Sequence, residues 1–199
     1  LAASPQASAI GAGQQPRFER SVGGQGRPGV FAWGVQYNPV TEEVLVGDYL
    51  NFKIRRYDKD GNALGDFYRP NHLGQPYSIA VDPRDGAIYV AELKDNPLTA
   101  AIAKYDKFGN YLYVANASLT SSTGNRFRAF YPVWMTVEED TGELWLLDSH
   151  YQNLGAPGTG LSEENPPRLL SLMFDDATQT VAENAAWPVT PPGTGPTNQ

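Results

Sequence analysis

The sequence predicts an all-β protein made of repeated units of four antiparallel strands. A block of apolar strand, turn and apolar strand occurs three times in register, and two further strand-like segments follow each copy. The composition agrees, because 20 glycines, 16 prolines and 12% aromatic residues among 199 suit short strands joined by frequent turns. With 41% hydrophobic and 19% charged residues, the chain is expected to fold around one well-buried core or two small ones.

The first two strands of each unit lie in the three copies of the block, Trp33–Tyr49, Tyr77–Leu93 and Val133–Ser149. The copies read WGVQYNPVTEEVLVGDY, YSIAVDPRDGAIYVAEL and VWMTVEEDTGELWLLDS, and they align without a gap. Each begins with an apolar run, reverses at a segment rich in turn residues, and returns through a second apolar run. Such nearly continuous apolar runs predict strands that are covered on both faces.

Third strands are expected at Phe52–Asp58, Ala100–Asp106 and Arg168–Asp175, and fourth strands at ALGDFY, YLYVAN and TQTVAEN. The segment YDKDGN, which joins the first such pair, places oxygen-bearing side chains on alternate positions, as a calcium loop would. Its second copy, YDKFGN, loses one of them, and the third, FDDATQ, loses the glycine. We therefore interpret the segment as a hairpin turn. Four antiparallel strands that repeat about every 45–55 residues are typical of β-propeller blades.

Within these units the residues resemble the NHL repeat. Blade one matches most closely, in WGVQYNP, VLVGDYLNFKIRRYD and KDGN, with Asn51 at the family's Asn position. Blade two carries Glu92 in place of the aspartate, and blade three carries Trp134 in a small-residue position. The resemblance spans roughly Phe18 to Asn184. It implies a six-bladed propeller, a fold whose relatives include binding modules, RNA binders and metal-dependent lactonases and amidating lyases.

The repeats also predict the domain organisation. Residues 1–16 are expected to form a flexible N-terminal segment, and residues 187–199 a Pro- and Gly-rich linker or tail. Residues 17–186 form the propeller segment, with blades at approximately 30–70, 75–117 and 130–184 and a strand at 17–22 that belongs to a preceding blade. Three blades alone leave apolar faces and an edge exposed. We expect the missing blades to come from the remainder of a longer chain, from a second copy or from another protein.

Charge and composition bear on partners and location. A net charge of −7 and a pI of about 4.8 argue against nucleic acid as a partner. The sequence has no cysteine, and no apolar run approaches the roughly 20 residues of a transmembrane helix. It begins with Leu, which we interpret as a processed or excised piece, and its excess of Arg over Lys favours a bacterial source. We expect an extracellular or cell-surface location.

Asp48, Glu92 and Asp148 occupy one equivalent position per repeat, at the end of the second strand. If these ends meet at a central channel, the carboxylates form part of an acidic ring that holds a divalent cation such as calcium. Alternatively, each accepts hydrogen bonds from its own connecting loop and fixes the corner of its blade. No other cofactor and no catalytic residue is expected, because GQGRPG precedes a strand rather than a helix and the consecutive DSH cannot converge as a triad.

Aromatic residues at the starts of the first strands, Trp33, Tyr77 and Trp134, are candidates for stacking a sugar or peptide or for packing between blades. The long insertion 150–167, which begins with His150 and Tyr151, is the strongest candidate for partner specificity. These features predict a non-catalytic protein- or glycan-interaction or structural module, part of a larger or oligomeric extracytoplasmic assembly. The alternative is a segment of a metal-dependent propeller hydrolase or lyase, lactonase-like or amidating-lyase-like, with the channel carboxylates on a divalent cation.

Overall fold

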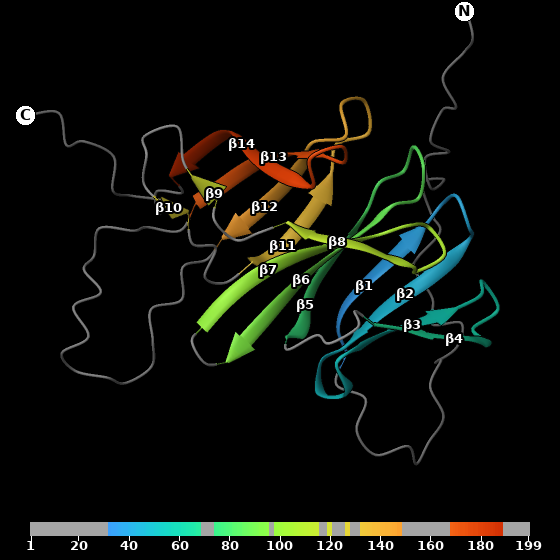
Figure 1. Ribbon diagram of the computed structural model, residues 1–199. Coiled ribbons are helices and arrows are strands. Elements are labelled where there is room, and N and C mark those ends of the chain that lie inside the picture. The colour runs from blue at the N-terminus through green and yellow to red at the C-terminus, as the bar shows by residue number, and fades with distance from the viewer. Residues whose placement is uncertain are drawn as a thin grey trace, which may run out of the picture.

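The computed structural model describes residues 32–68, 74–95, 98–115, 119–120, 126–127, 132–148 and 168–188. These residues form three antiparallel sheets of four strands and one sheet of two strands (Figure 1). In each four-stranded sheet the spatial order of the strands equals their order in the chain, as in a propeller blade. The prediction of repeated four-stranded units is confirmed, and we call the sheets blades one, two and three.

The strands follow the predicted segments closely. Blade one contains β1 (Ala32–Asn38), β2 (Glu43–Asp48), β3 (Lys53–Tyr57) and β4 (Ala63–Phe67). Blade two contains β5 (Gln75–Val81), β6 (Ile88–Asp95), β7 (Leu98–Tyr105) and β8 (Tyr111–Ala115). Blade three contains β11 (Pro132–Val137), β12 (Leu144–Asp148), β13 (Arg168–Asp175) and β14 (Thr180–Pro188). Neighbouring blades meet through their first strands, since β1 lies against β5 and β5 against β11.

Two small elements were not predicted. A 3-10 turn, η1 (Tyr49–Asn51), follows β2, and a short hairpin of β9 (Leu119–Thr120) and β10 (Arg126–Phe127) lies between blades two and three, with β9 close to β14. The strand expected at 17–22, the segment 1–16 and most of the expected tail lie outside the described residues, although β14 extends to Pro188. In the part of the chain that the structure describes, no helix is long and apolar enough to cross a membrane.

The segment YDKDGN forms a tight turn between β3 and β4. Asp58 Oδ1 accepts hydrogen bonds from the backbone N–H groups of Asp60 and Asn62 at 2.9 and 2.8 Å, and Oδ2 accepts one from Asn62 Nδ2 at 2.8 Å. These bonds lower the pKa of Asp58. Asp106 repeats the arrangement between β7 and β8 with Asn110. The turn interpretation is confirmed.

Two apolar layers hold the three blades together. The layer between blades one and two consists of Leu45, Ile54 and Phe67 from one side and Ile79, Val81, Ile88, Val90, Ala103 and Tyr105 from the other. The layer between blades two and three consists of Ala80, Ala87, Tyr89, Ala91 and Ile102 against Met135, Val137, Leu144, Leu146, Leu170 and Leu172. Because side chains alternate along a strand, blade two buries both of its faces. Burial of apolar surface from water supplies the main attraction between blades.

Candidate interaction surfaces

A β-bulge near the start of each first strand displaces one residue per blade from the regular pairing. The register with the second strand shifts at Trp33 in blade one, at Tyr77 in blade two and at Val133 in blade three. Immediately before each bulge, the opposite strand presents an acid, in the pairs Ala32–Asp48, Pro76–Glu92 and Pro132–Asp148. The three acids therefore occupy one structural position, as their spacing in the sequence predicted.

Trp33 and Tyr77 meet in an aromatic cluster with Tyr49 of η1. The ring centroids lie 4.7 Å apart for Trp33 and Tyr77, 5.3 Å for Trp33 and Tyr49, and 6.1 Å for Tyr49 and Tyr77. Tyr77 is buried, whereas Trp33 is 44% exposed, so the cluster presents an accessible indole over a packed base. Trp134 lies one position beyond the bulge of its blade, pairs with Leu147 and is 65% exposed.

Among the three candidate acids, Asp48 shows how one carboxylate is held. Its buried carboxylate accepts hydrogen bonds from Asn51 Nδ2, at 2.9 Å to each oxygen, and from Arg55 Nε at 2.7 Å. Since Asn51 belongs to η1 and Arg55 to β3, these contacts fix the corner between β2 and β3. Asp148 and Glu92 are also buried. Within the described ranges, no three Asp, Glu, His or Cys side chains gather as a metal site would require, and cation binding stays a prediction.

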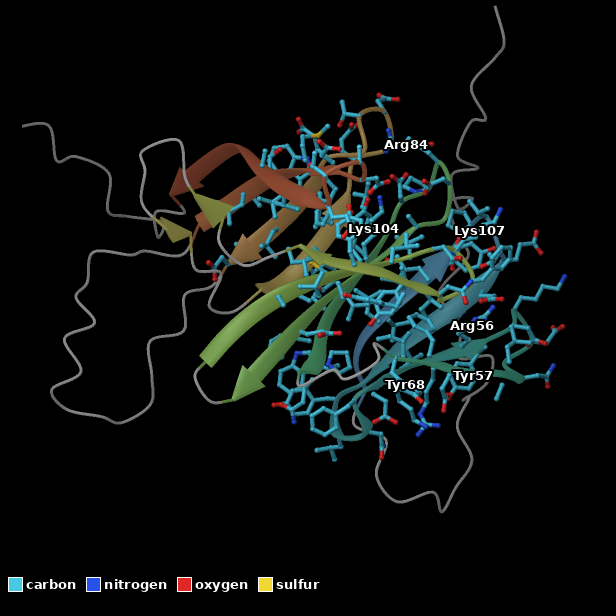
Figure 2. The ribbon with its side chains drawn as sticks, viewed as in Figure 1. Arg56, Tyr57, Tyr68, Arg84, Lys104 and Lys107 are labelled. Atoms are coloured by element: carbon cyan, nitrogen blue, oxygen red, sulfur yellow. The ribbon has the colours of Figure 1, made fainter. Side chains whose placement is uncertain are left out.

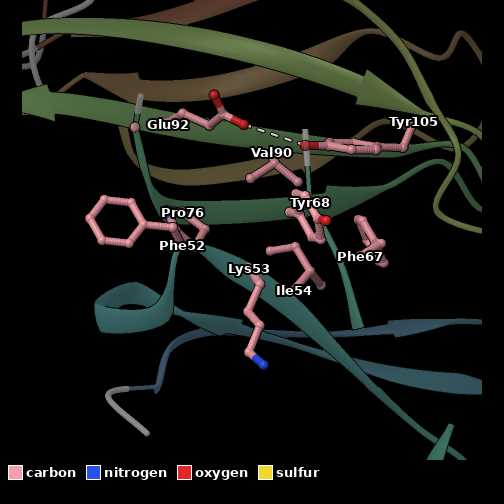
Figure 3. Close-up of a pocket in the computed structure, with 10 residues that line it drawn as sticks. Phe52, Lys53, Ile54, Phe67, Tyr68, Pro76, Val90, Glu92 and Tyr105 are labelled. Carbon is pink, nitrogen blue, oxygen red and sulfur yellow. Dashed lines mark hydrogen bonds between the residues drawn. The ribbon is translucent and has the colours of Figure 1, made fainter. Parts of the chain in front are cut away.

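A small pocket lies between blades one and two beside Glu92 (Figure 3). The Tyr105 hydroxyl points toward Glu92 and donates to Oε1 at 3.4 Å, while Lys53 points away from it and pairs with Asp66. The pocket has room for about one water molecule. An organic ligand does not fit in this pocket.

Blade one presents an open apolar face. Paired residues on adjacent strands share a face, which here carries Val35 and Tyr37 of β1, Val44 and Val46 of β2, and Tyr57 of β3, together with Arg55 of β3, which forms an ion pair with Asp48. The equivalent residues of blade two, Ile79, Val81, Ile88, Val90 and Tyr105, form the layer against blade one. Val35 is 61% exposed, whereas Ile79 is 2% exposed. The first-strand positions that pack against a preceding blade in blade two are therefore exposed in blade one, where Val44, Val46 and Tyr57 beside them are half-buried, and we call this surface the head face.

Blade three presents the opposite face of a blade to solvent. By the alternation of side chains, the surface turned away from blade two carries Trp134 and Thr136 of β11, Trp145 and Leu147 of β12, and Leu169, Ser171 and Met173 of β13. Trp134 and Met173 are among the exposed large apolar residues. The equivalent residues of blade two include Ala80, Tyr89, Ala91 and Ile102, which pack against blade three. We call this surface of blade three the tail face.

Charged side chains also cross the junction between blades two and three. Lys104 Nζ of β7 donates to both carboxylate oxygens of Asp176, at 2.6 and 2.8 Å, and the Tyr113 hydroxyl donates to the same carboxylate at 2.6 Å. Asp176 lies in the turn between β13 and β14, so the contact links two blades. Lys104 is labelled in Figure 2. Burial by itself lowers the pKa of Lys104, but the bonds to Asp176 and the nearby Tyr89 raise it overall.

The residue that corresponds to Lys104 differs in blades one and three. Arg56 of blade one forms a bidentate pair with Glu43 of its own blade, at 2.8 and 2.6 Å, and donates to the Phe108 carbonyl of blade two at 3.2 Å. Ser171 of blade three donates to Glu143 of its own blade at 2.8 Å. In blade two the position of these glutamates is Ala87. Lys104 therefore takes its carboxylate from the following blade.

Sequence reasoning missed Tyr49 and these junction contacts, and it named residues that the structure does not describe. His150 and Tyr151, with the rest of the insertion 150–167, lie outside the described residues. The exchange of Glu43 and Glu143 for Ala87 is visible once the repeats are aligned. Because Ala87 cannot accept a bond from Lys104 as Glu43 does from Arg56, the alignment could have predicted that Lys104 bonds to a residue outside its own blade.

Three blades that pack through their first strands define this chain as a segment of a β-propeller. No protein-family model matches it, and no curated protein matches it. It is similar to the crystal structure of a nidogen/laminin complex, with a TM-score of 0.51, 16% identity, and coverage of 80% of this chain and 49% of that one. It is also similar to virginiamycin B lyase from Staphylococcus aureus, in a catalytically inactive variant with quinupristin, with a TM-score of 0.52, 16% identity, and coverage of 84% and 44%.

A second structure of that lyase, substituted with selenomethionine, gives a TM-score of 0.52 and 15% identity. These proteins are β-propellers, and at such low identity the likeness shows the fold alone. This chain spans less than half the length of each of these chains.

Proposed function

We propose that the chain is a non-catalytic interaction and structural module of NHL-type blades, which associates through its head and tail faces with protein partners in a larger propeller assembly. The observation that carries the proposal is the exposure of Val35, at a position where Ile79 and Met135 are buried against a neighbouring blade. Folded monomers rarely leave contiguous apolar surface of this kind in water. The same sheet face is buried between blades in blades two and three but exposed in blade one, which supports its use as an interface.

Two further observations support association with protein. The head face is rich in β-branched and aromatic residues, and the tail face carries Trp134, Trp145 and Met173, residue types that are enriched in interface cores. One of the compared propeller structures is a complex of nidogen with laminin, so the fold serves protein association there. The accessible Trp33 of the aromatic cluster adds a smaller surface suited to stacking on a peptide or sugar ring.

The test compares the wild type with a Val35→Glu/Tyr37→Glu variant in sedimentation and in binding of a dye that reports exposed apolar surface. We expect the wild type to associate or to bind the dye, and the variant to do less of both with an unchanged circular dichroism spectrum. Leu112→Glu is the matched control, because Leu112 is 45% exposed on the outermost strand of blade two. A wild type that is monomeric and does not bind the dye would refute the proposal.

A further inference from the structure

We propose that the ring of Phe108, in the turn between β7 and β8, anchors a separate binding surface whose partner is a protein with basic residues around an apolar pocket. The surface consists of Phe108, Lys107, Val40 and Gly86, and we call it the Phe108 patch. None of these residues belongs to the head face or to the tail face, so the inference goes beyond the proposed function. The patch lies where blade one meets blade two.

The side chain of Phe108 takes no part in forming its turn. The backbone N–H of Phe108 donates to Asp106 Oδ1 at 2.9 Å. The equivalent residues Asp60 in blade one and Ala177 in blade three make the same bond, each at 2.9 Å, to the aspartate of their own turn. The turn therefore forms equally with an acidic, an aromatic or a small side chain. The ring of Phe108 is 57% exposed, and since the turn does not require it, the ring is available for binding.

The backbone that carries this ring is held at several points. The Phe108 carbonyl accepts a hydrogen bond from Arg56 Nη1 at 3.2 Å, and Arg56 is itself fixed by its bidentate pair with Glu43. The next residue, Gly109, lies so close to Phe67 of blade one that an added Cβ would be 2.6 Å from the ring. Blade one thus fixes the turn of blade two. A side chain presented in this way loses little conformational freedom on binding.

Phe108 belongs to a contiguous patch formed by three turns. Lys107 Nζ lies 5.2 Å from the centroid of the Phe108 ring. A Cβ added at Gly86 would lie 2.9 Å from Lys107 Cβ and 3.0 Å from Val40 Cβ, so the glycine allows the β1–β2 and β7–β8 turns to meet at the β5–β6 turn. Val40 is 40% exposed. The exposed apolar groups are therefore Phe108 and Val40, with the stem of Lys107 beside them.

The turns around the patch carry most of the negative charge. The hairpin turns of the three blades lie at one end of their sheets (Figure 1) and comprise residues 39–43, 58–62, 82–87, 106–110, 138–143 and 175–179. Together with Arg56 and Lys104, which bond to turn residues, they contain 13 acidic and five basic residues. The other described residues contain six acidic and five basic ones.

This distribution defines the partner. An apolar centre within a charged rim is the usual anatomy of a protein interface, and aromatic residues are enriched at such centres. Because the rim is acidic, complementarity requires basic residues on the partner, and an anionic partner would be repelled. The protruding ring of Phe108 requires an apolar pocket, where its burial from water supplies affinity.

The test selects short random peptides, displayed on phage, on the immobilised full chain at low salt. We expect the selected peptides to be rich in Lys and Arg and to contain apolar residues. The affinity of a selected synthetic peptide, measured by fluorescence anisotropy, should fall about 10- to 100-fold with Phe108→Ala. It should also fall as the salt concentration rises, because salt screens the acidic rim. The midpoint of urea unfolding should be the same for Phe108→Ala and the wild type.

Leu64→Ala is the matched control, because Leu64 is 47% exposed on β4 and lies outside the patch. It should leave the affinity unchanged, and so should the head-face variant Val35→Glu/Tyr37→Glu. The inference is overturned if no peptide is selected, if the peptides are not basic, or if Phe108→Ala binds them as the wild type does or unfolds at lower urea. Peptides lost only with the head-face variant would overturn it while supporting the proposed function.

Discussion

Lys104 of blade two and Asp176 of blade three form an ion pair in which the ammonium is buried and the carboxylate is not. The Lys104 side chain is 7% exposed and that of Asp176 is 66% exposed, and the Tyr89 ring lies 5.4 Å from Nζ. The two partners therefore differ in what their removal leaves behind. Loss of Asp176 leaves a buried cation, whereas loss of Lys104 leaves a carboxylate that water can solvate.

This asymmetry predicts unequal costs of substitution. We expect Asp176→Ala to lower the free energy of unfolding by about 1–3 kcal/mol, and Lys104→Met by about 1 kcal/mol or less, after allowance for solvent screening of the exposed carboxylate. Tyr113→Phe, which keeps the ion pair, should cost no more than about 1 kcal/mol. Urea unfolding of the three variants measures these values. Equal costs for the two ionic partners would show that the burial of Lys104 is unimportant.

The same pair predicts a change of stability in acid. Burial tends to raise the pKa of Asp176, but the hydrogen bonds from Lys104 and Tyr113 outweigh it, and the pKa lies below the usual 3.8. A carboxyl whose pKa is lowered by folding stabilises the native state above its unfolded pKa, and this contribution is lost as the pH falls through the folded value. The stability difference between wild type and Asp176→Asn should therefore shrink below about pH 4. A difference that is constant from neutral pH into acid would contradict this.

Gly109 is predicted to be intolerant of any side chain. It has φ of +85°, and an added Cβ would lie 2.6 Å from Phe67 Cδ1 across the junction of blades one and two. Gly109→Ala combines backbone strain with overpacking and should cost about 2–4 kcal/mol in thermal or urea unfolding. Gly47→Ala is the matched control, because its nearest neighbour would lie at 3.5 Å in ordinary contact, and its cost should stay below about 1 kcal/mol. Similar costs for the two would contradict the close approach of Phe67.

The carboxylates at the ends of the second strands predict the response to calcium. Because Asn51 and Arg55 already donate to Asp48, we expect millimolar calcium to leave the melting temperature unchanged. Asp48→Asn should still lower the stability by about 1–3 kcal/mol, since Arg55 loses its charged partner. A rise in melting temperature with calcium that Asp48→Asn abolishes would support the acidic ring instead.

Strand positions could be predicted because the repeat supplies the same information three times. The block around Ile79 has the apolar pattern of a strand buried on both faces, and its register relative to Val35 and Met135 follows from the alignment alone. The hairpin of β9 and β10 has no counterpart in the other units and only two residues per strand, so no pattern predicted it.

The site residues were harder to predict, because their partners come from other segments of the chain. Tyr49 joins Trp33 and Tyr77 only through the bulges and η1, which depend on local backbone geometry rather than on apolar periodicity. Trp134 was grouped with Trp33 because both lie at the start of a first strand, although the alignment of the repeats places Trp134 at the position of Gly34. A shift of one residue relative to the bulge gives it a different environment.

The burial of both faces of blade two determines the order in which the protein should open. Strands β5, β6 and β7 can be exposed only after a neighbouring blade has detached, whereas the outer blades have one apolar layer each to lose. Amide hydrogen exchange should consequently be slowest for the centre of β6 and faster for β1 and β11, in units that correspond to whole blades. The central blade is therefore expected to open last, and its amides should report the global unfolding of the segment.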